Sequence, residues 1–292
     1  MIKPAISLIV LALSALGISY AVSPLRTFDT LVPKDSNARK VAEGLEYGDH
    51  TRQALDIYAP TENSDGLRPV VVFFYGGSWN SGTREGYNFA GRALASRGYI
   101  VAVPDYRLVP EVRFPGFVED GAAAVRWVRQ NITTYGGDPD RIVLMGHSAG
   151  AYIAAMLATN PQWLGADRVA LRGLVGLAGP YDFAPLDTDA SIAAFGEWPR
   201  VAETQPISFA DDSAPPALLL TGADDTIVKP RNSQALLATL QDAGVDARMV
   251  TYPGIDHIDI LIAMSRPLRG RTPVLDDAAR FIDRVTAPEL AD

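Results

Sequence analysis

The middle of the chain contains a series of continuous apolar runs separated by stretches with helical periodicity. The apolar runs lie at residues 70–75, 100–103, 142–145, 171–177, 217–221 and 247–252. An uninterrupted run of this length is typical of a strand that is covered on both faces of its sheet. The intervening helices are predicted near residues 86–97, 117–131, 230–243 and 276–285. Strands that alternate with helices at this spacing predict an α/β fold with a mostly parallel central sheet and helices on both faces.

Two segments depart from this rhythm. Residues 46–59 alternate between apolar and polar around a Gly-Asp turn, which predicts a strand pair at a sheet edge. Residues 179–214 carry four prolines among aromatic and acidic residues. That composition predicts a loop or a small lid insertion, a place where substrate contacts vary between related proteins.

The N-terminus has the pattern of an export signal. Lys3 precedes an uncharged stretch at residues 5–22 that is rich in Leu, Ile and Ala. This pattern predicts a cleavable signal peptide over residues 1–23. The stretch also approaches the ~20 residues that span a bilayer, so an uncleaved membrane anchor is the alternative. Both predict an exported protein, periplasmic or secreted, with residues 24–45 as a polar tether and residues 46–287 as one domain.

Charge and cysteine content narrow the class of function. Lys plus Arg total 26 against 34 for Asp plus Glu, and the resulting net charge of −8 argues against a nucleic-acid surface. The chain has no cysteine, which excludes disulfides, thiolate metal sites and a cysteine nucleophile. At 292 residues, 48% of them apolar, the chain is long enough to bury the core of a single α/β domain.

The strongest motif is Gly146-His147-Ser148-Ala149-Gly150, which follows the apolar run 142–145 and precedes a run of helix formers. The order strand, G-x-S-x-G, helix is that of a nucleophile elbow, in which a strained turn projects the serine from the end of a sheet. The flanking glycines let the backbone approach itself without Cβ clashes. The sequence therefore predicts Ser148 as a nucleophile.

A serine hydroxyl needs a base, and the chain has three histidines. His50 lies in the predicted N-terminal strand pair. His147 is next to Ser148, so its side chain must point away from that of the serine. His257 follows the strand at 247–252, at the sheet edge where ligands bind in such folds. By elimination and chain order, we expect His257 to be the base.

An acid that orients the histidine is expected between the serine and the histidine in the sequence. Asp224 and Asp225 both follow the strand at 217–221 and so reach the same sheet edge. Spacing alone does not separate these two residues. Asp182, after the preceding strand, is a weaker rival.

The tetrahedral intermediate of acyl transfer needs preorganised N–H donors. Residues 76–79 follow the first central strand, in the crossover where an oxyanion hole is usually placed, and can supply backbone N–H groups. The amide of Ala149, directly after the nucleophile, is a further candidate donor.

The motifs together resemble those of α/β-hydrolases of the carboxylesterase type, close to the hormone-sensitive-lipase-like and arylformamidase-like esterases. The resemblance covers roughly residues 45–287. Tyr75-Gly-Gly-Ser-Trp79 resembles the H-G-G-x-W loop, Asp105-Tyr-Arg-Leu-Val-Pro110 the D-Y-R-L-x-P segment, and Gly222-Ala-Asp-Asp-Thr226 with His257 the acid and base segments. The resemblance implies that Asp225 is the acid. The chain departs from the pattern at Tyr75, where the family has a histidine that supports the oxyanion loop.

The resemblance implies an α/β-hydrolase fold and a serine carboxylesterase that hydrolyses small carboxylic esters through an acyl-enzyme, without metal or cofactor. The implied residues are Ser148, His257 and Asp225 for catalysis and the amides of Gly77, Ser78 and Ala149 for the oxyanion. Trp79, Phe183, Phe209 and Trp198 are predicted to face the serine and to form a shallow acyl pocket. An amidase or arylformamidase with the same triad is one alternative, and a catalytically silent, membrane-tethered binding module is another. The sequence does not predict an oligomeric state.

Overall fold

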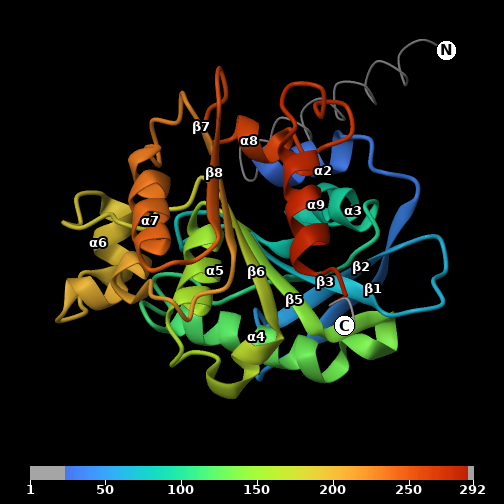
Figure 1. Ribbon diagram of the computed structural model, residues 1–292, viewed down its shortest axis with the longest axis horizontal. Helices are drawn as coiled ribbons and strands as arrows, with labels where there is room; N and C mark the ends of the chain where they lie inside the picture. Colours follow the sequence, from blue (N-terminus) through green and yellow to red (C-terminus); the bar gives the residue numbers. More distant parts are fainter. Residues whose placement is uncertain (1–23, 289–292) are drawn as a thin grey trace, which may run out of the picture.

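The computed structural model describes residues 24–288, and an eight-stranded sheet lies at its centre (Figure 1). The strands follow the order β1-β2-β4-β3-β5-β6-β7-β8. Strands β1 and β2 pair antiparallel with each other, and β2 pairs antiparallel with β4, whereas all pairings from β4 to β8 are parallel. The predicted mostly parallel sheet is confirmed. The strands are β1 Ala38–Glu46, β2 Ala54–Pro60, β3 Arg68–Phe74, β4 Ile100–Pro104, β5 Gly137–His147, β6 Leu171–Leu177, β7 Ala217–Gly222 and β8 Ala247–Tyr252.

Helices cover both faces of the sheet, as predicted. Helices α3 and α9 contact each other on one face, and α4, α5 and α7 lie on the other (Figure 1). The α-helices are α2 Pro24–Leu31, α3 Asn88–Ala95, α4 Gly116–Asn131, α5 Ala149–Thr159, α6 Asp189–Phe195, α7 Arg231–Asp242, α8 Asp259–Ile262 and α9 Val274–Val285. Short 3₁₀ helices are η1 Arg84–Tyr87, η2 Ile132–Tyr135, η3 Gly165–Ala170, η4 Val201–Thr204 and η5 Pro206–Phe209.

The segment at residues 24–45 is part of the folded domain, so its prediction as a polar tether is wrong. Its first part forms α2, in which the buried Asp29 carboxylate accepts a hydrogen bond from the Phe89 amide at 2.7 Å. The Phe28 ring packs edge-on against that of Phe89, with centroids 5.2 Å apart. Its last part lies in β1, which pairs with β2. The many charged residues of this segment are compatible with folding because burial in β1 alternates along an edge strand.

The lid at residues 179–214 holds α6, η4 and η5 between β6 and β7. Helix α6 begins with a capping box, in which the Thr188 hydroxyl accepts a hydrogen bond from the Ser191 amide at 3.1 Å. Helix α8, directly after His257, has no counterpart among the predicted helices.

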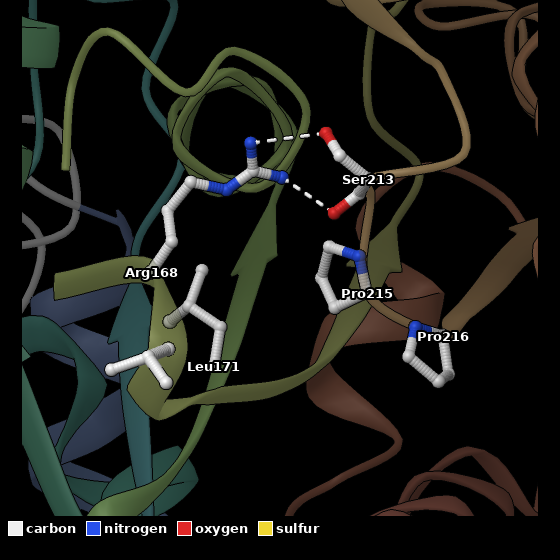
Figure 2. Close-up of a pocket in the computed structure, with 6 residues that line it drawn as sticks. Arg168, Leu171, Ser213, Pro215 and Pro216 are labelled. Atoms are coloured by element: carbon white, nitrogen blue, oxygen red, sulfur yellow. Dashed lines mark hydrogen bonds between the residues drawn. The ribbon is translucent and has the colours of Figure 1, made fainter. Parts of the chain in front are cut away.

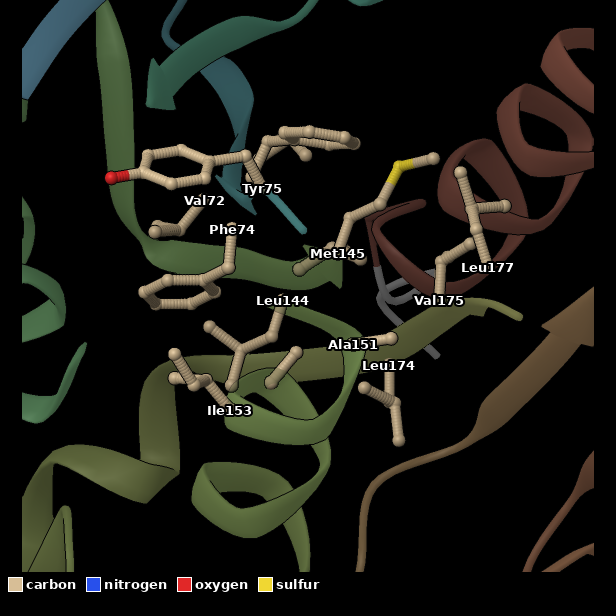
Figure 3. Packing of buried hydrophobic residues seen from close by; sticks show 14 of the residues in the cluster. Val72, Phe74, Tyr75, Leu144, Met145, Ala151, Ile153, Leu174, Val175 and Leu177 are labelled. Carbon is tan, nitrogen blue, oxygen red and sulfur yellow. The ribbon is translucent and has the colours of Figure 1, made fainter. Parts of the chain in front are cut away.

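Helix α5 packs against the central strands of the sheet (Figure 3). Side chains of β3, β5 and β6 meet those of α5, which is buried along its whole length. The helix is rich in alanine, and small side chains let its axis lie close to the sheet. At its start, a Cβ built on Gly150 would lie 2.1 Å from the carbonyl oxygen of Phe74. The packing of α5 therefore fixes the turn that carries Ser148.

Among residues 24–288, none of the helices has the length and apolar character needed to cross a membrane. The predicted signal peptide or anchor at residues 1–23 lies outside the described residues.

Candidate active site

Ser148 occupies a strained turn between β5 and α5. Its φ is +54° and its ψ is −123°, a conformation that costs free energy for a residue with a Cβ. The turn is held by the Ser148 amide, which donates to the Leu177 carbonyl at 2.9 Å. Glycine is required on either side, since a Cβ on Gly146 would lie 2.4 Å from the carbonyl of Gly150. The local structure is the nucleophile elbow that the sequence predicts.

The structure brings the predicted nucleophile, base and acid into one chain of hydrogen bonds. The Nε2 atom of His257 lies 2.9 Å from Oγ of Ser148, and its Nδ1 atom lies 2.7 Å from Oδ2 of Asp225. The relative exposure of the three residues is 9% for Ser148, 5% for His257 and 3% for Asp225. A carboxylate only accepts hydrogen bonds, so Nδ1 of His257 carries the proton and Nε2 offers its lone pair to the serine hydroxyl. This tautomer is the one that a general base requires.

The same geometry separates the two neighbouring acids. The second carboxylate oxygen of Asp225 accepts hydrogen bonds from the amides of Ile227 and Val228 at 2.9 and 2.8 Å. Asp224 is exposed, and its amide donates to the Ile255 carbonyl at 3.1 Å. Asp225 is thus the acid that contacts His257.

The other candidates for acid and base lie elsewhere. Asp182 is exposed in the lid, where its amide donates to the Asn232 side chain at 3.1 Å. Nδ1 of His50 accepts a hydrogen bond from the Arg52 amide at 3.1 Å, so Nε2 carries the proton and points to the Glu111 carboxylate at 2.7 Å. Neither residue belongs to the hydrogen-bonded chain of Ser148.

The loop after β3 places backbone N–H groups near the serine. Gly77, Ser78 and Trp79 have φ values of +138°, +52° and +59° in succession. Gly77 has no room for a side chain, because a Cβ there would lie 2.2 Å from the carbonyl oxygen of Ser81. Within residues 24–288, the amides of Gly77, Ser78 and Ala149 donate to no other protein group. These three amides are therefore available as oxyanion donors.

Tyr75 anchors this loop at the position where the esterase family that the sequence resembles has a histidine. Its hydroxyl donates to Oδ1 of Asp105 at 2.6 Å and accepts from Arg52 at 2.7 Å. The Tyr106 hydroxyl donates to the Tyr75 carbonyl at 2.8 Å, and the two rings stack with centroids 4.8 Å apart. Burial, and then the nearby Asp105 carboxylate, raise the pKa of Tyr75, so the phenol stays a neutral donor. The loop is therefore anchored although Tyr75 stands in place of the family's histidine.

A pocket with a volume of about 430 Å³ opens beside Ser148. Trp79 and Phe183 stack on each other with ring centroids 6.0 Å apart, and both line the pocket, as predicted. The wall opposite the lid comes from the segment after Asp225, with Ile227, Lys229 and Arg231 among its residues. These wall residues were not predicted from the sequence, although their position directly after the acid is a signal that could have identified them.

The prediction that Phe209 and Trp198 face the serine is wrong, because neither residue lines the pocket. Phe209 belongs to η5, which packs against α5 and α7. The Trp198 ring packs edge-on against Phe114 with centroids 5.0 Å apart, and its Nε1 donates to Glu203 at 3.1 Å. Both rings are half-buried packing residues of the lid.

A second pocket, of about 370 Å³, lies at the N-terminal ends of β6 and β7, and Figure 2 shows the residues that line it. It is lined near the start of β6 by Arg168 and Leu171, and before β7 by Ser213, Pro215 and Pro216. The guanidinium of Arg168 is hydrogen-bonded there, since it donates to the carbonyl of Ser213 at 2.9 Å and to that of Ala158 at 2.8 Å. This pocket lies away from the triad, which follows the other ends of the strands.

Comparison with known proteins supports an esterase family. The family model described as BD-FAE matches residues 55–240. The isoprenylcysteine alpha-carbonyl methylesterase ICME of Arabidopsis thaliana is 33% identical over 286 residues, covering 87% of this chain and 66% of the relative. Esterase LipC of Mycobacterium tuberculosis is 30% identical, with 72% of this chain and 58% of the relative covered. The chain thus spans less than two thirds of the length of these curated relatives.

Solved structures match over nearly the whole chain. Esterase B from Lactobacillus rhamnosis superimposes with a TM-score of 0.79, 22% identity, and coverage of 94% of this chain and 95% of that one. A truncated carbohydrate esterase from gut microbiota gives a TM-score of 0.76 at 23% identity, covering 88% of this chain and all of that one. At such identities the matches establish the fold, and they confirm the predicted α/β-hydrolase fold.

Proposed function

The chain belongs to the BD-FAE family, and from that premise we propose that it is a serine carboxylesterase that hydrolyses small carboxylic esters through an acyl-enzyme. The observation that carries the proposal is the hydrogen-bonded chain from Ser148 through His257 to Asp225, with 2.9 and 2.7 Å between the successive pairs. The names of the curated relatives, which are esterases, support the same reaction class.

In the first half of the reaction, Oγ of Ser148 attacks the ester carbonyl while Nε2 of His257 takes the hydroxyl proton. The Asp225 carboxylate stabilises the imidazolium that forms. The carbonyl oxygen becomes an oxyanion, which the amides of Gly77, Ser78 and Ala149 are positioned to bind. The tetrahedral intermediate then breaks the bond to the alcohol oxygen, and His257 returns the proton to the leaving alcohol.

In the second half, water takes the place of the alcohol. His257 removes a proton from the water as it attacks the acyl carbon, and the second tetrahedral intermediate expels Ser148 as its hydroxyl. The products are one carboxylic acid and one alcohol. No step uses a group beyond the triad, the amides and water.

The proposal is tested by turnover of a panel of p-nitrophenyl esters and N-formyl aromatic amines with the full chain and its Ser148→Ala variant. The Ser148 side chain carries little packing, so the variant should keep its circular dichroism spectrum and melting temperature. Ester turnover should fall by several orders of magnitude, leaving a rate ~10³-fold above that in water, which the oxyanion donors and substrate binding supply. A variant that kept more than about a tenth of the activity, a loss below ~1.4 kcal/mol in barrier, would remove Ser148 as nucleophile.

The same panel decides between substrate classes. Faster turnover of the N-formyl amines than of every ester would favour the amidase or arylformamidase alternative. No turnover of any substrate would favour a binding module, although such a module has no need of a complete triad.

We also propose that the protein is exported, with residues 1–23 as signal peptide or anchor. The support is the positive charge of Lys3 followed by the uncharged stretch at residues 5–22. Cell fractionation of the full chain tests this: recovery outside the cytoplasm or in the membrane is expected, and recovery only in the cytoplasm contradicts it.

A further inference from the structure

A second histidine is buried at the site without a part in the proton transfers. His147 precedes Ser148, has a relative exposure of 2%, and packs against the His257 ring with centroids 4.8 Å apart. Its Nε2 atom lies 2.8 Å from the backbone carbonyl oxygen of His257. The contact joins the end of β5 to the loop after β8, 110 residues apart in the sequence.

The contact fixes the tautomer of His147. A carbonyl oxygen only accepts hydrogen bonds, so Nε2 must carry the proton and Nδ1 must be bare. Nδ1 is buried and has no partner among residues 24–288. Burial, and then the neighbouring His257, lower the pKa of His147 to about 3. The ring is therefore neutral, and its single N–H points at His257.

The other edge of the ring faces the oxyanion loop. A Cβ built on Gly76 would lie 2.9 Å from Nδ1 of His147 and 3.0 Å from Cβ of Ser148. The ring thus fills the space between the loop that carries the oxyanion donors and the loop that carries the base. Within the described part of the chain, no other group donates to the His257 carbonyl.

We propose that His147 is a positioning residue, which fixes the backbone of His257 so that its imidazole is aligned between Ser148 and Asp225. The inference rests on the proposed function for its effect on rate. If only the side-chain hydrogen bonds of His257 held it, its backbone could still shift with the loop after β8. Such a shift would lower the rate of proton transfer without changing how the substrate binds. His147 does not line the substrate pocket, so its effect should fall on kcat and leave KM unchanged.

Neutrality is part of this role. The charged or titratable groups that act on His147 are His257 and the Asp225 carboxylate. During catalysis His257 becomes an imidazolium, and a second cation in the adjacent ring would oppose that charge. A histidine that stays neutral at working pH donates its hydrogen bond without this repulsion.

The test compares His147→Phe, which keeps a ring and removes the donor, with His147→Gln, which restores an amide N–H near the position of Nε2. We expect His147→Phe to lower kcat on a p-nitrophenyl ester about tenfold, the size expected for one buried positioning hydrogen bond. KM should stay within about twofold of the wild type, and His147→Gln should recover most of kcat.

The matched control is Tyr99→Phe, which removes another buried hydrogen-bond donor far from the triad; the Tyr99 hydroxyl lies 2.7 Å from Oδ1 of Asp283 and 3.0 Å from the carbonyl oxygen of Ala279. Tyr99→Phe should lower the melting temperature about as much as His147→Phe while leaving kcat unchanged. Unchanged kcat in His147→Phe overturns the inference. An equal loss of kcat in the Phe and Gln variants also overturns it, because the role would then be packing alone.

A measurement on the unmodified protein avoids any failure of the variants to fold. Nuclear magnetic resonance of ¹⁵N-labelled histidine should show His147 as the neutral Nε2–H form at pH 5 to 8. A proton on Nδ1, or a titration within that range, overturns the inference. This result does not depend on turnover, so it stands apart from failure of the proposed esterase function.

Discussion

Replacing Asp225 by asparagine should reverse the tautomer of the base. The amides of Ile227 and Val228 both donate to one oxygen of Asp225, at 2.9 and 2.8 Å. In Asp225→Asn these two donors hold the amide oxygen on their side and turn its NH₂ group towards Nδ1 of His257. Nδ1 must then accept, so the proton moves to Nε2 and the lone pair no longer faces Ser148.

The expected loss combines this wrong tautomer with loss of the carboxylate charge that stabilises the imidazolium. In a serine protease triad the same change costs about 10⁴ in kcat, which corresponds to about 5 kcal/mol in the barrier, and we expect a similar loss here. The control is Asp224→Asn: the Asp224 side chain is exposed and has no partner among the described residues, so its loss should change the rate less than about threefold.

The assay is side-by-side kinetics of the two variants and the wild type on p-nitrophenyl acetate, with melting temperatures to verify folding. Activity of Asp225→Asn within tenfold of wild type would refute the tautomer argument. A larger loss in Asp224→Asn than in Asp225→Asn would move the role of acid to Asp224.

Three further predictions follow from the site. The pKa of His147 is about 3 in the folded protein against 6.5 for an unperturbed histidine, so the unfolded state binds more protons below pH 6.5 and stability falls as the pH falls. Between pH 7.5 and 5, His147 should remove about 2 kcal/mol from the free energy of unfolding, measured in urea. His147→Gln should lack this pH-dependent loss. A free energy of unfolding that falls equally with pH in the variant and the wild type would contradict the prediction. Because the bulky, stacked rings of Trp79 and Phe183 line the pocket of about 430 Å³, kcat/KM on p-nitrophenyl esters should peak at acetyl to butyryl and fall by octanoyl. A profile that still rises at octanoyl would indicate a deep acyl slot. Lys229 and Arg231 line the pocket, and neither forms an ion pair within the described residues. Changing both to Gln should reduce the preference for a carboxylate-bearing ester over its neutral analogue about fivefold at low salt. A preference that does not respond to salt would argue against a direct charge effect.

The central fold could be predicted because its signal is local. Runs such as residues 70–75 and 171–177 are apolar throughout, and only strands covered on both faces need such runs. The strand pair predicted within residues 46–59 is present at the sheet edge, but its first strand, β1, ends at Glu46 instead of beginning there. Burial alternates along β1 and its charged residues are solvated, so the polar composition of residues 38–45 predicts a tether instead of a strand.

The site could be predicted to the level of segments, and the structure was needed for individual atoms. Spacing brings Asp224 and Asp225 to the same strand end, and the amides of Ile227 and Val228 decide which carboxylate turns inward. Chain order likewise places Phe209 in the lid but does not say which face of η5 it occupies. The contact of His147 with the His257 backbone joins distant segments and leaves no trace in spacing.

The proposed reaction requires above all that Ser148 is a nucleophile activated by His257. The most direct measurement is peptide mass mapping after treatment of the full chain with an alkyl p-nitrophenyl phosphonate, which adds a phosphonyl group to an activated serine and releases p-nitrophenol. One p-nitrophenol should be released per protein, activity should be lost in proportion, and the adduct should lie on Ser148 and be absent from His257→Ala. An adduct on another residue, or equal labelling of His257→Ala, would contradict this mechanism.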